Sequence, residues 1–191
     1  MKLAIFGGTF DPIHEAHLAV AREAAERFGL DRVLFIPAAH PPHKAGATQA
    51  PYADRLRMTE LACECDPRFE ASPLEAGTLR SYSIDTIEKL RSSLAPADDL
   101  FFIAGADAFS EIRTWRRWRD VARAVRFVVV SRPGHVYETP PEASIERLDT
   151  VEMAVSSSLI RAALARGVRP THVPERVLEY ILSHRLYVSA P

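Results

Sequence analysis

The sequence predicts an α/β protein built on a doubly wound parallel sheet, with residues 1–191 forming a single domain. Short apolar runs alternate along the chain with longer segments of helical period, which is typical of a parallel sheet with helices on both faces. The runs are also uniformly apolar rather than alternating, as expected for strands buried on both faces. Right-handed crossovers between such strands give a doubly wound fold.

Each element can be placed in chain order. The predicted strands lie at 2–7, 32–37, 68–75, 100–105, 126–131 and 144–149, of which 68–75 and 144–149 are the weaker candidates. The predicted helices lie at 14–28, 52–65, 84–94, 116–124, 157–166 and 174–184. Ser156 is a good N-cap and Gly167 a good C-cap for the fifth helix. A polar loop at 38–51 and a proline-rich loop at 133–144 remain, and long loops in compact domains are often functional.

The composition excludes several classes of function. The chain has 191 residues and a formal net charge of −1, so anion binding must be local, and we expect no nucleic-acid or membrane partner. No run approaches the roughly 20 apolar residues of a membrane span, and "KLAIFGG" after Met1 lacks the apolar core of a signal peptide. Because Cys63 and Cys65 are the only cysteines, we expect a cytoplasmic protein without a disulfide framework.

The stretch "IFGGTFDPIHEAH" at 5–17 joins the first strand to the first helix. Loop amides and a helix N-terminus at such a place can bind phosphate. The chain nevertheless contains neither G-x-G-x-x-G here nor G-x-x-x-x-G-K-[ST] anywhere, so the dinucleotide fingerprint and the P-loop are both absent. His14 and His17 share a helix face. They are open to three interpretations: two polar residues at a helix start, a metal pair without an evident third ligand, or phosphate contacts, which the glycines, Thr9 and Pro12 favour.

"GGTFDPIHEAH" resembles the G-x-F-x-P-x-H-x-x-H signature of the nucleotidyltransferase superfamily. Members of this superfamily have a Rossmann-like nucleotidyltransferase fold and transfer AMP or CMP from a nucleoside triphosphate to a phosphate-bearing acceptor. The resemblance implies that His14 and His17 contact the phosphates of ATP and stabilise the transition state, where negative charge gathers. The other ATP-binding residues that it implies here are Gly7, Gly8, Thr9 and Phe10.

A second motif, "VSSSLIRAALARG", lies at 155–167. A well-capped helix is its plain interpretation, but Arg161 falls in the first turns, where the helix dipole favours an anion. A phosphate held by the Ser157 and Ser158 amides and the guanidinium would resolve this conflict. "SSSLIR" resembles the superfamily signature I-S-S-T-x-I-R, which implies that Arg161 is catalytic and that Ser156, Ser157, Ser158 and Arg161 bind ATP.

Further segments resemble the bacterial nicotinate mononucleotide adenylyltransferases. "IPAAHPPHK" at 36–44 is similar to the loop P-x-x-x-P-P-H-K, which implies that His43 and Lys44 face a substrate phosphate and that Lys44 is catalytic. His40 stands near the place of a frequent asparagine, whose phosphate contact is lost or is replaced by this histidine. "SRPGH" at 131–135 is similar to the R-P-G segment, which implies that Arg132 reaches a substrate phosphate.

Three more segments imply where the base and ribose bind. "SYSIDTI" resembles S-Y-T-x-D-T, which implies that Tyr82 lies in the substrate site and that Thr86 contacts the nicotinate carboxylate. "TWRRWRDV" resembles the segment whose tryptophan, here Trp115, stacks on the pyridine ring, with Arg116 beside it. "IAGADAF" resembles the segment that places Asp107 at the ATP ribose. A core tryptophan and a capping aspartate are the plainer interpretations. Donors at Thr86 and at the backbone near Trp115 and Arg116 predict selectivity for acid over amide of roughly 10²–10⁴ in kcat/KM.

The sequence therefore predicts an adenylyltransferase that converts ATP and nicotinate mononucleotide to nicotinate adenine dinucleotide (deamido-NAD) and pyrophosphate. Mg²⁺ is the expected cofactor, held largely by the nucleotide and water, with no metal site on the protein. The alternatives are the same chemistry on nicotinamide mononucleotide or phosphopantetheine, and a non-catalytic nucleotide-binding regulator. The tryptophan and S-Y-S segments argue against phosphopantetheine, and the intact histidine pair argues against the regulator. Oligomeric state stays open, a homo-oligomer included.

Overall fold

The computed structural model describes residues 1–40, 49–78, 80–131, 134, 136–149 and 154–188. Its strands are β1 (Lys2–Gly8), β2 (Arg32–Pro37), β3 (Phe69–Ala71), β4 (Asp99–Gly105), β5 (Arg126–Ser131) and β6 (Ser144–Asp149). They form one parallel sheet of order β3-β2-β1-β4-β5-β6. This is the strand order of a doubly wound, Rossmann-like sheet, so the predicted fold class is confirmed.

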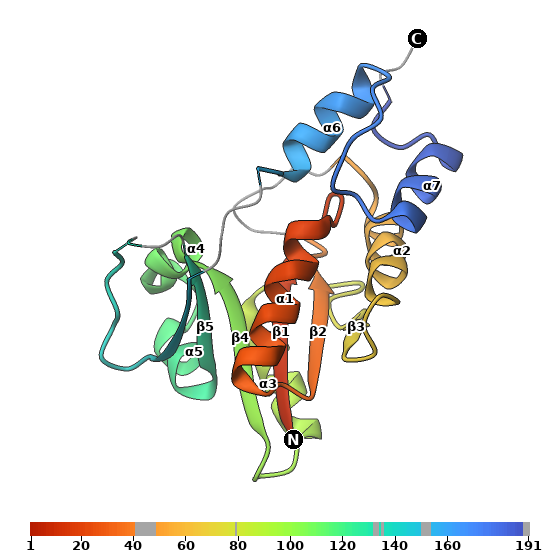
Figure 1. The fold of residues 1–191 in the computed structure, drawn as a ribbon. Coiled ribbons are helices and arrows are strands. Elements are labelled where there is room, and N and C mark those ends of the chain that lie inside the picture. The colour runs from red at the N-terminus through yellow and green to blue at the C-terminus, as the bar shows by residue number, and fades with distance from the viewer. Residues whose placement is uncertain (41–48, 79, 132–133, 135, 150–153, 189–191) are drawn as a thin grey trace.

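Helices cover both faces of the sheet (Figure 1). They are α1 (Glu15–Phe28), α2 (Tyr52–Cys63), α3 (Ser83–Ser93), α4 (Ala106–Ser110), the 3₁₀ turn η1 (Ile112–Thr114), α5 (Trp118–Ala124), α6 (Ser157–Ala165) and α7 (Glu175–Ser183). One apolar cluster joins the sheet to α1, α2, α6 and α7, and a second joins it to α3, α4, η1 and α5.

The two clusters explain why the strand sequences are apolar at consecutive positions. In β1, Ala4 belongs to the cluster beneath α1, whereas Leu3 and Ile5 belong to the cluster beneath α3. Successive side chains of a strand point to opposite faces. Since both faces are covered by helices, neither set of side chains reaches solvent.

The sheet creates a natural binding crevice at the carboxyl end of β1. This strand pairs with β2 on one side and with β4 on the other, so the direction of winding reverses here, which is where ligands of such folds bind. Gly8 ends β1 and Gly105 ends β4. In Figure 1, α6 and α7 lie above this end of the central strands.

Several boundaries differ from those expected. The helix predicted over 116–124 begins only at Trp118, because Arg117 has a left-handed backbone with φ of +52°. The strand candidate at 68–75 reduces to Phe69–Ala71. The helix predicted over 157–166 ends at Ala165, and Gly167 occupies the left-handed position beyond it, with φ of +70°. The short helices α4 and η1 were not predicted.

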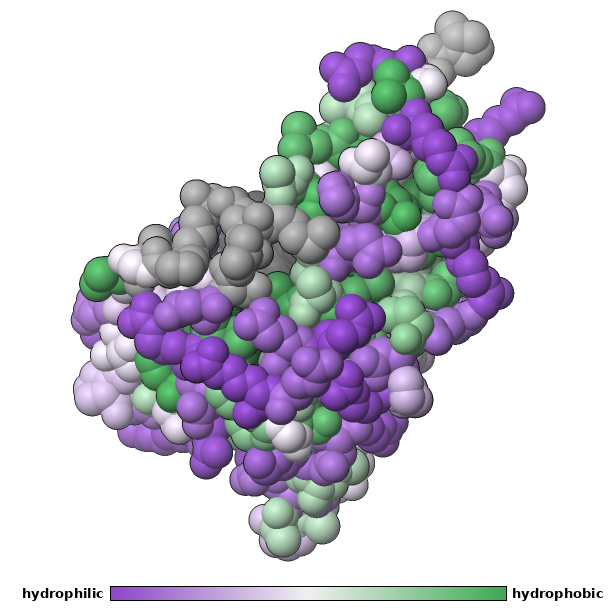
Figure 2. Space-filling model, viewed as in Figure 1, coloured by the Kyte–Doolittle hydropathy of each residue, from purple (hydrophilic) through white to green (hydrophobic). Residues whose placement is uncertain are grey.

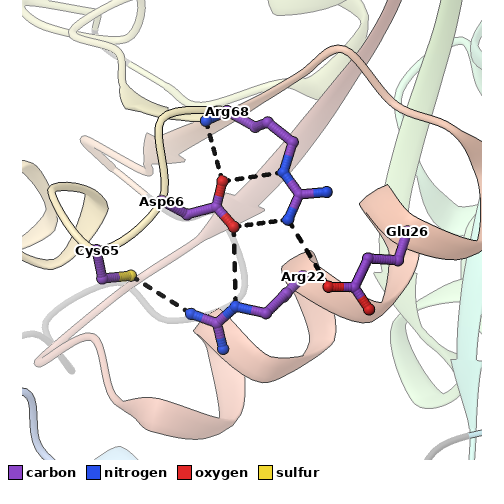
Figure 3. A network of polar contacts seen from close by, with 5 residues as sticks. All are labelled: Arg22, Glu26, Cys65, Asp66 and Arg68. Atoms are coloured by element: carbon purple, nitrogen blue, oxygen red, sulfur yellow. Dashed lines mark hydrogen bonds and ion pairs between the residues drawn. The ribbon is translucent and has the colours of Figure 1, made fainter.

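A network of polar contacts ties α1 to the turn between α2 and β3 (Figure 3). Asp66 accepts two hydrogen bonds from the guanidinium of Arg68, at 2.9 and 2.7 Å, and these hold the pKa of Asp66 below its usual value. Arg22 of α1 lies 3.7 Å from both Asp66 and the Cys65 sulfur, and Glu26 lies 3.9 Å from Arg68. Asp66 is buried, whereas its partners Arg22 and Arg68 are partly exposed, so the network holds this turn against α1.

The surface divides into two kinds of area. Figure 2 shows a mainly hydrophilic face over the sheet and α1, with hydrophobic side chains gathered toward α6 and α7. Leu159 of α6, Leu182 of α7, Val168 between them and Val188 after α7 are the large exposed apolar residues of that part. Within the described part of the chain, no helix is long and apolar enough to cross a membrane.

Candidate active site

The loop between β1 and α1 is a tight turn built around Phe10. Phe10 has a left-handed backbone, with φ of +47°, and its ring is buried. A Cβ added to Gly8 would lie 2.7 Å from the nearest atom of that ring, closer than carbon atoms approach, so this position requires glycine. The turn brings the carboxyl end of β1 directly to the start of α1 at Glu15.

The two histidines stack on each other at the start of α1. The ring centroids of His14 and His17 are 3.7 Å apart, with 28° between the ring planes, and the edge of Phe10 packs against His17 at 5.1 Å. The backbone N–H of His14 donates to Nδ1 of His17 at 3.2 Å. Because this nitrogen accepts, the neutral ring of His17 must carry its proton on Nε2. His17 is thus a hydrogen-bond donor of fixed orientation.

Burial keeps both histidines uncharged without a ligand. Desolvation lowers the pKa of His14 to about 4. It also lowers the pKa of His17 well below its usual value, and the neighbouring His14 adds to this effect. Nδ1 of His14 is buried without a hydrogen-bond partner among the described residues. An anion placed beside His14 would favour the charged form of that ring, whereas Nδ1 of His17 cannot be protonated while it accepts the His14 backbone N–H.

The second motif meets the first at the N-terminus of α6. Ser156 caps this helix by accepting a hydrogen bond from the Leu159 amide at 3.3 Å, as predicted. Ser157 donates through its hydroxyl to the Pro12 carbonyl at 2.9 Å. Arg161 donates to the Asp11 carbonyl at 2.7 Å. Segments about 145 residues apart in the sequence therefore meet here, and the cationic corner is the place where Arg161 lies against the loop of Asp11 and Pro12.

A buried arginine that the sequence did not single out, Arg55, contacts the loop that leads to the two histidines. Arg55 of α2 is 1% exposed, and its guanidinium donates to the carbonyls of Thr9, Ala38 and Ala50, at 2.7, 2.8 and 3.3 Å. Two of these carbonyls follow β1 and β2. Arg55 therefore holds together the loops that leave the two adjacent strands.

A cavity of about 630 Å³ opens beside the first motif, at the carboxyl ends of β1 and β4. It is lined by Ile5, Phe6, Gly7, Gly8, Thr9, Ile36, Ala38, Glu75, Ser81, Tyr82, Ser83, Thr86, Phe102, Ile103, Ala104, Gly105, Ala108, Glu111, Thr114, Trp115 and Arg116. Its volume suits a small ligand. The cavity brings together the residues that the sequence assigned to the start of the phosphate motif and to the base of the acceptor.

Aromatic and cationic groups form one wall of the cavity. The half-buried Trp115 packs against Phe102, with ring centroids 5.7 Å apart. The Arg116 guanidinium lies over the Tyr82 ring at 4.8 Å, a distance typical of a cation–π contact. Trp115 thus offers a supported flat ring to the cavity, as its proposed stacking role requires.

The polar groups near Thr86 differ from the arrangement expected from the sequence. The Thr86 hydroxyl donates to Glu75 at 3.0 Å, and both side chains are buried at the cavity wall. The Trp115 amide donates to the Ile112 carbonyl at 3.0 Å. Two of the three expected donors, the Thr86 hydroxyl and the Trp115 amide, therefore already have an acceptor in the protein.

The remaining predicted residues are placed less directly. Asp107 lies on α4 between Gly105 and Ala108, which both line the cavity, and its side chain is exposed. The backbone of His40 pairs with cavity-lining Ser81: His40 N–H donates to the Ser81 hydroxyl at 3.0 Å. The predicted His43, Lys44 and Arg132 lie outside the described residues. His14, His17 and Arg161 adjoin the cavity through the loop that begins at Gly8, but do not line it.

Sequence reasoning missed five polar residues at this site: Asp11, Arg55, Glu75, Glu111 and Tyr187. Asp11 falls on a variable position of the first signature, between Phe10 and Pro12, so the signature did not mark it. Nothing local distinguishes the others from the many arginines, glutamates and tyrosines of the chain. Their burial and their partners come only from tertiary contacts.

Comparison with known proteins agrees with this geometry. The cytidylyltransferase-like family model matches residues 5–163. The chain is 69% identical over 187 residues to a Solibacter usitatus protein named "Probable nicotinate-nucleotide adenylyltransferase", covering 98% of this chain and 100% of that one. It is 43% identical over 189 residues to a Thermus thermophilus protein of the same name, with 98% and 100% covered. A structure of Plasmodium falciparum nicotinic acid mononucleotide adenylyltransferase complexed with NaAD shares the fold, with a TM-score of 0.79, 17% identity and 97% of each chain covered.

The parallel sheet, with two motifs meeting at the carboxyl end of its first strand, defines a nucleotidyltransferase. The matched family model covers most of the chain, and the relatives are similar over nearly their whole length. The chain belongs to the cytidylyltransferase-like family and, within it, to the nicotinate-nucleotide adenylyltransferases.

Proposed function

We propose that this enzyme transfers AMP from ATP to nicotinate mononucleotide, giving nicotinate adenine dinucleotide and pyrophosphate in NAD biosynthesis. The observation that carries the proposal is the continuous cavity between Trp115 and the loop at Gly8 and Thr9. A pyridine ring stacked on Trp115 would direct the phosphate of its mononucleotide toward the first motif. The α-phosphate of ATP would meet it there.

Catalysis follows from alignment and charge neutralisation. A phosphate oxygen of the acceptor attacks the α-phosphorus of ATP in line, the new P–O bond forms, and the bond to the β-phosphate breaks. Pyrophosphate leaves with the electron pair of the broken bond. The acceptor is already an anion, so no side chain needs to remove a proton. His17 donates from Nε2, and Arg161 adds fixed positive charge, where the transition state gathers negative charge.

Mg²⁺ would supply further neutralisation of the β- and γ-phosphates. Among the described residues, no group of three or more His, Cys, Asp or Glu side chains could hold a metal ion. The phosphate oxygens of the bound nucleotide are the hard donors that Mg²⁺ prefers, and we propose that they and water hold the ion.

Small molecules are the proposed partners, and the cytoplasm is the proposed compartment. The mononucleotide would occupy the cavity, and the phosphates of ATP would bind at the cationic corner. We also propose that residues 1–191 act as a single nucleotidyltransferase domain, because Ser157 and Arg161 from late in the chain contact the loop after its first strand.

The direct test is pyrophosphate release with ATP and each of three acceptors. We expect release with nicotinate mononucleotide, less with nicotinamide mononucleotide, and none with phosphopantetheine. A preference for phosphopantetheine would move the assignment to another acceptor class. ATP binding without transfer to any acceptor would favour the nucleotide-binding regulator.

Replacing Arg161 with lysine should raise the KM for ATP about tenfold. Lysine keeps the charge but loses the planar fork that lets arginine hold the Asp11 carbonyl and a phosphate together. Steady-state kinetics at saturating acceptor measure this change, and the KM for nicotinate mononucleotide should stay near its wild-type value. A change confined to the acceptor KM would mean that Arg161 contacts the other phosphate.

ATP binding at pH 6 should be coupled to proton uptake. The pKa of His14 is about 4 and that of His17 is also lowered, so both rings are neutral at this pH without nucleotide. The triphosphate raises the pKa of His14, whose Nδ1 has no hydrogen-bond partner among the described residues, so a proton binds together with ATP. Calorimetric titrations in buffers of different ionisation enthalpy measure the uptake. The difference between wild type and His14→Gln removes the contribution of the nucleotide itself; equal uptake in the two would contradict the prediction.

A further inference from the structure

The chain that follows α7 makes a turn with two left-handed residues. Arg185 has a φ of +52° and Tyr187 a φ of +62°. Such values are uncommon for residues other than glycine and have an energetic cost. The Leu186 amide donates to the Ile181 carbonyl at 3.0 Å, which anchors the turn to α7. The result is that the Tyr187 side chain enters the core, where it is 8% exposed.

The hydroxyl of Tyr187 reaches the first motif. It donates to Oδ1 of Asp11 at 2.7 Å. Burial raises the pKa of Tyr187, so the hydroxyl stays protonated and acts as the donor. Asp11 is 2% exposed, and its carboxylate also accepts from the Gln49 and Ala50 amides at 2.8 and 3.1 Å. A buried carboxylate with three donors is held in one orientation.

Asp11, held in this way, contacts Arg161 in the cationic corner. Its backbone carbonyl accepts from Arg161 at 2.7 Å. The side chain of Asp11 is thus held by Tyr187 of the C-terminal segment, while the backbone carbonyl of Asp11 holds Arg161. The guanidinium of Arg161 also donates to the Ser158 hydroxyl, at 3.4 Å, and its Nε is buried without a partner among the described residues. The Asp11 carbonyl therefore accepts the shorter of the two hydrogen bonds that place this guanidinium.

We propose that Tyr187 is a positioning residue for the nucleotide site. Through Asp11 it fixes the guanidinium of Arg161, so the last described turn of the chain is part of the ATP-binding machinery. This inference rests on the proposed function, because it assigns Arg161 to ATP. The test is the Tyr187→Phe variant, which removes one oxygen and keeps the ring in the core.

The chain offers a matched control in Tyr180. This residue of α7 also donates its hydroxyl to an aspartate of another element, Asp54 of α2, at 2.8 Å. Asp54 makes no contact with the first motif in the hydrogen bonds of the described residues. Both Phe variants should lower the thermal midpoint, because each loses one hydrogen bond. A purely structural role for Tyr187 predicts the same kinetic behaviour in both.

We expect Tyr187→Phe to raise the Kd and KM for ATP about three- to tenfold, the effect of one lost hydrogen bond. The KM for nicotinate mononucleotide should not change, and Tyr180→Phe should leave all constants at wild-type values. Asp11→Asn, which keeps the backbone carbonyl but weakens its support, should reproduce the ATP effect. Combining Tyr187→Phe with Arg161→Lys should have less effect than the product of the two, because both act on one guanidinium.

The ATP Kd is measured by calorimetry without acceptor, which separates this inference from the proposed function. Wild-type protein that binds ATP but transfers AMP to no acceptor would refute the proposed function and leave the positioning role testable. An unchanged ATP Kd in folded Tyr187→Phe would overturn the positioning role. So would equal increases in Tyr187→Phe and Tyr180→Phe, or full multiplicativity with Arg161→Lys.

Discussion

Replacing His17 with alanine should lower kcat by about two orders of magnitude or more, the usual effect of removing one preorganised donor from a transition state. The donor is preorganised here because Nδ1 of His17 accepts the His14 backbone N–H at 3.2 Å, which leaves the proton on Nε2. The ring also stacks on His14 and meets the edge of Phe10. A donor with this support does not have to reorganise as the reaction proceeds.

The fold should survive this substitution, because His17 is half-buried and the apolar face of α1 is formed by other residues, Leu18 and Ala21 among them. Single-turnover kinetics at saturating ATP and acceptor measure the chemical step, and circular dichroism reports the fold. His184→Ala is the control, since His184 also stacks on an aromatic ring, that of Tyr180 at 3.9 Å, away from the motif. Folded His17→Ala protein with a wild-type kcat would refute the assigned role.

The four central strands were predictable from the sequence because burial on both faces makes each of them a contiguous apolar run, unlike the edge strand β6, whose residues are mostly polar and at most partly buried apart from Leu148. The runs at 2–7, 32–37, 100–105, 126–131 and 144–149 match the observed strands to within one residue at each end. The helix α4, with five residues, and η1, with three, are too short to show a helical period. Arg117 delays the start of α5 through a left-handed backbone, which a composition of arginines and tryptophans does not indicate.

The candidate site was predictable only in part, and for a physical reason. Glycine, proline and histidine at fixed spacing mark a phosphate loop locally, so His14, His17 and the residues before them could be proposed. Arg55 and Tyr187 act through contacts with residues 46 and 176 positions away. No local pattern encodes such contacts. Glu75 also changes the expected recognition of the substrate, because its carboxylate accepts the hydrogen bond that Thr86 was expected to donate to the substrate.

Nicotinate mononucleotide should be preferred over the amide by roughly 10–10² in kcat/KM, less than the sequence alone predicted. Each unsatisfied buried group costs about 1–3 kcal/mol, and about 1.4 kcal/mol is tenfold. The Trp115 amide already donates to the Ile112 carbonyl, so it does not help to distinguish the acid from the amide substrate. The Thr86 hydroxyl has one proton, for which the substrate carboxylate must compete with Glu75. Among the described residues, the hydrogen bonds leave only the Arg116 amide of the three expected donors unengaged, which supports one full penalty rather than two.

Two substitutions should therefore move this preference in opposite directions. Thr86→Val removes the shared donor and should bring the two substrates closer together. Glu75→Gln removes a negative charge and can donate its own N–H to the Thr86 oxygen, which frees the hydroxyl proton for the substrate, so the preference for the acid should increase. Trp115→Ala is the control: it should lower kcat/KM for both substrates alike, because both pyridine rings stack. The measurement is kcat/KM for the two mononucleotides at one saturating ATP concentration. A preference that falls in Glu75→Gln would show that the carboxylate orients Thr86 toward the substrate rather than competing with it.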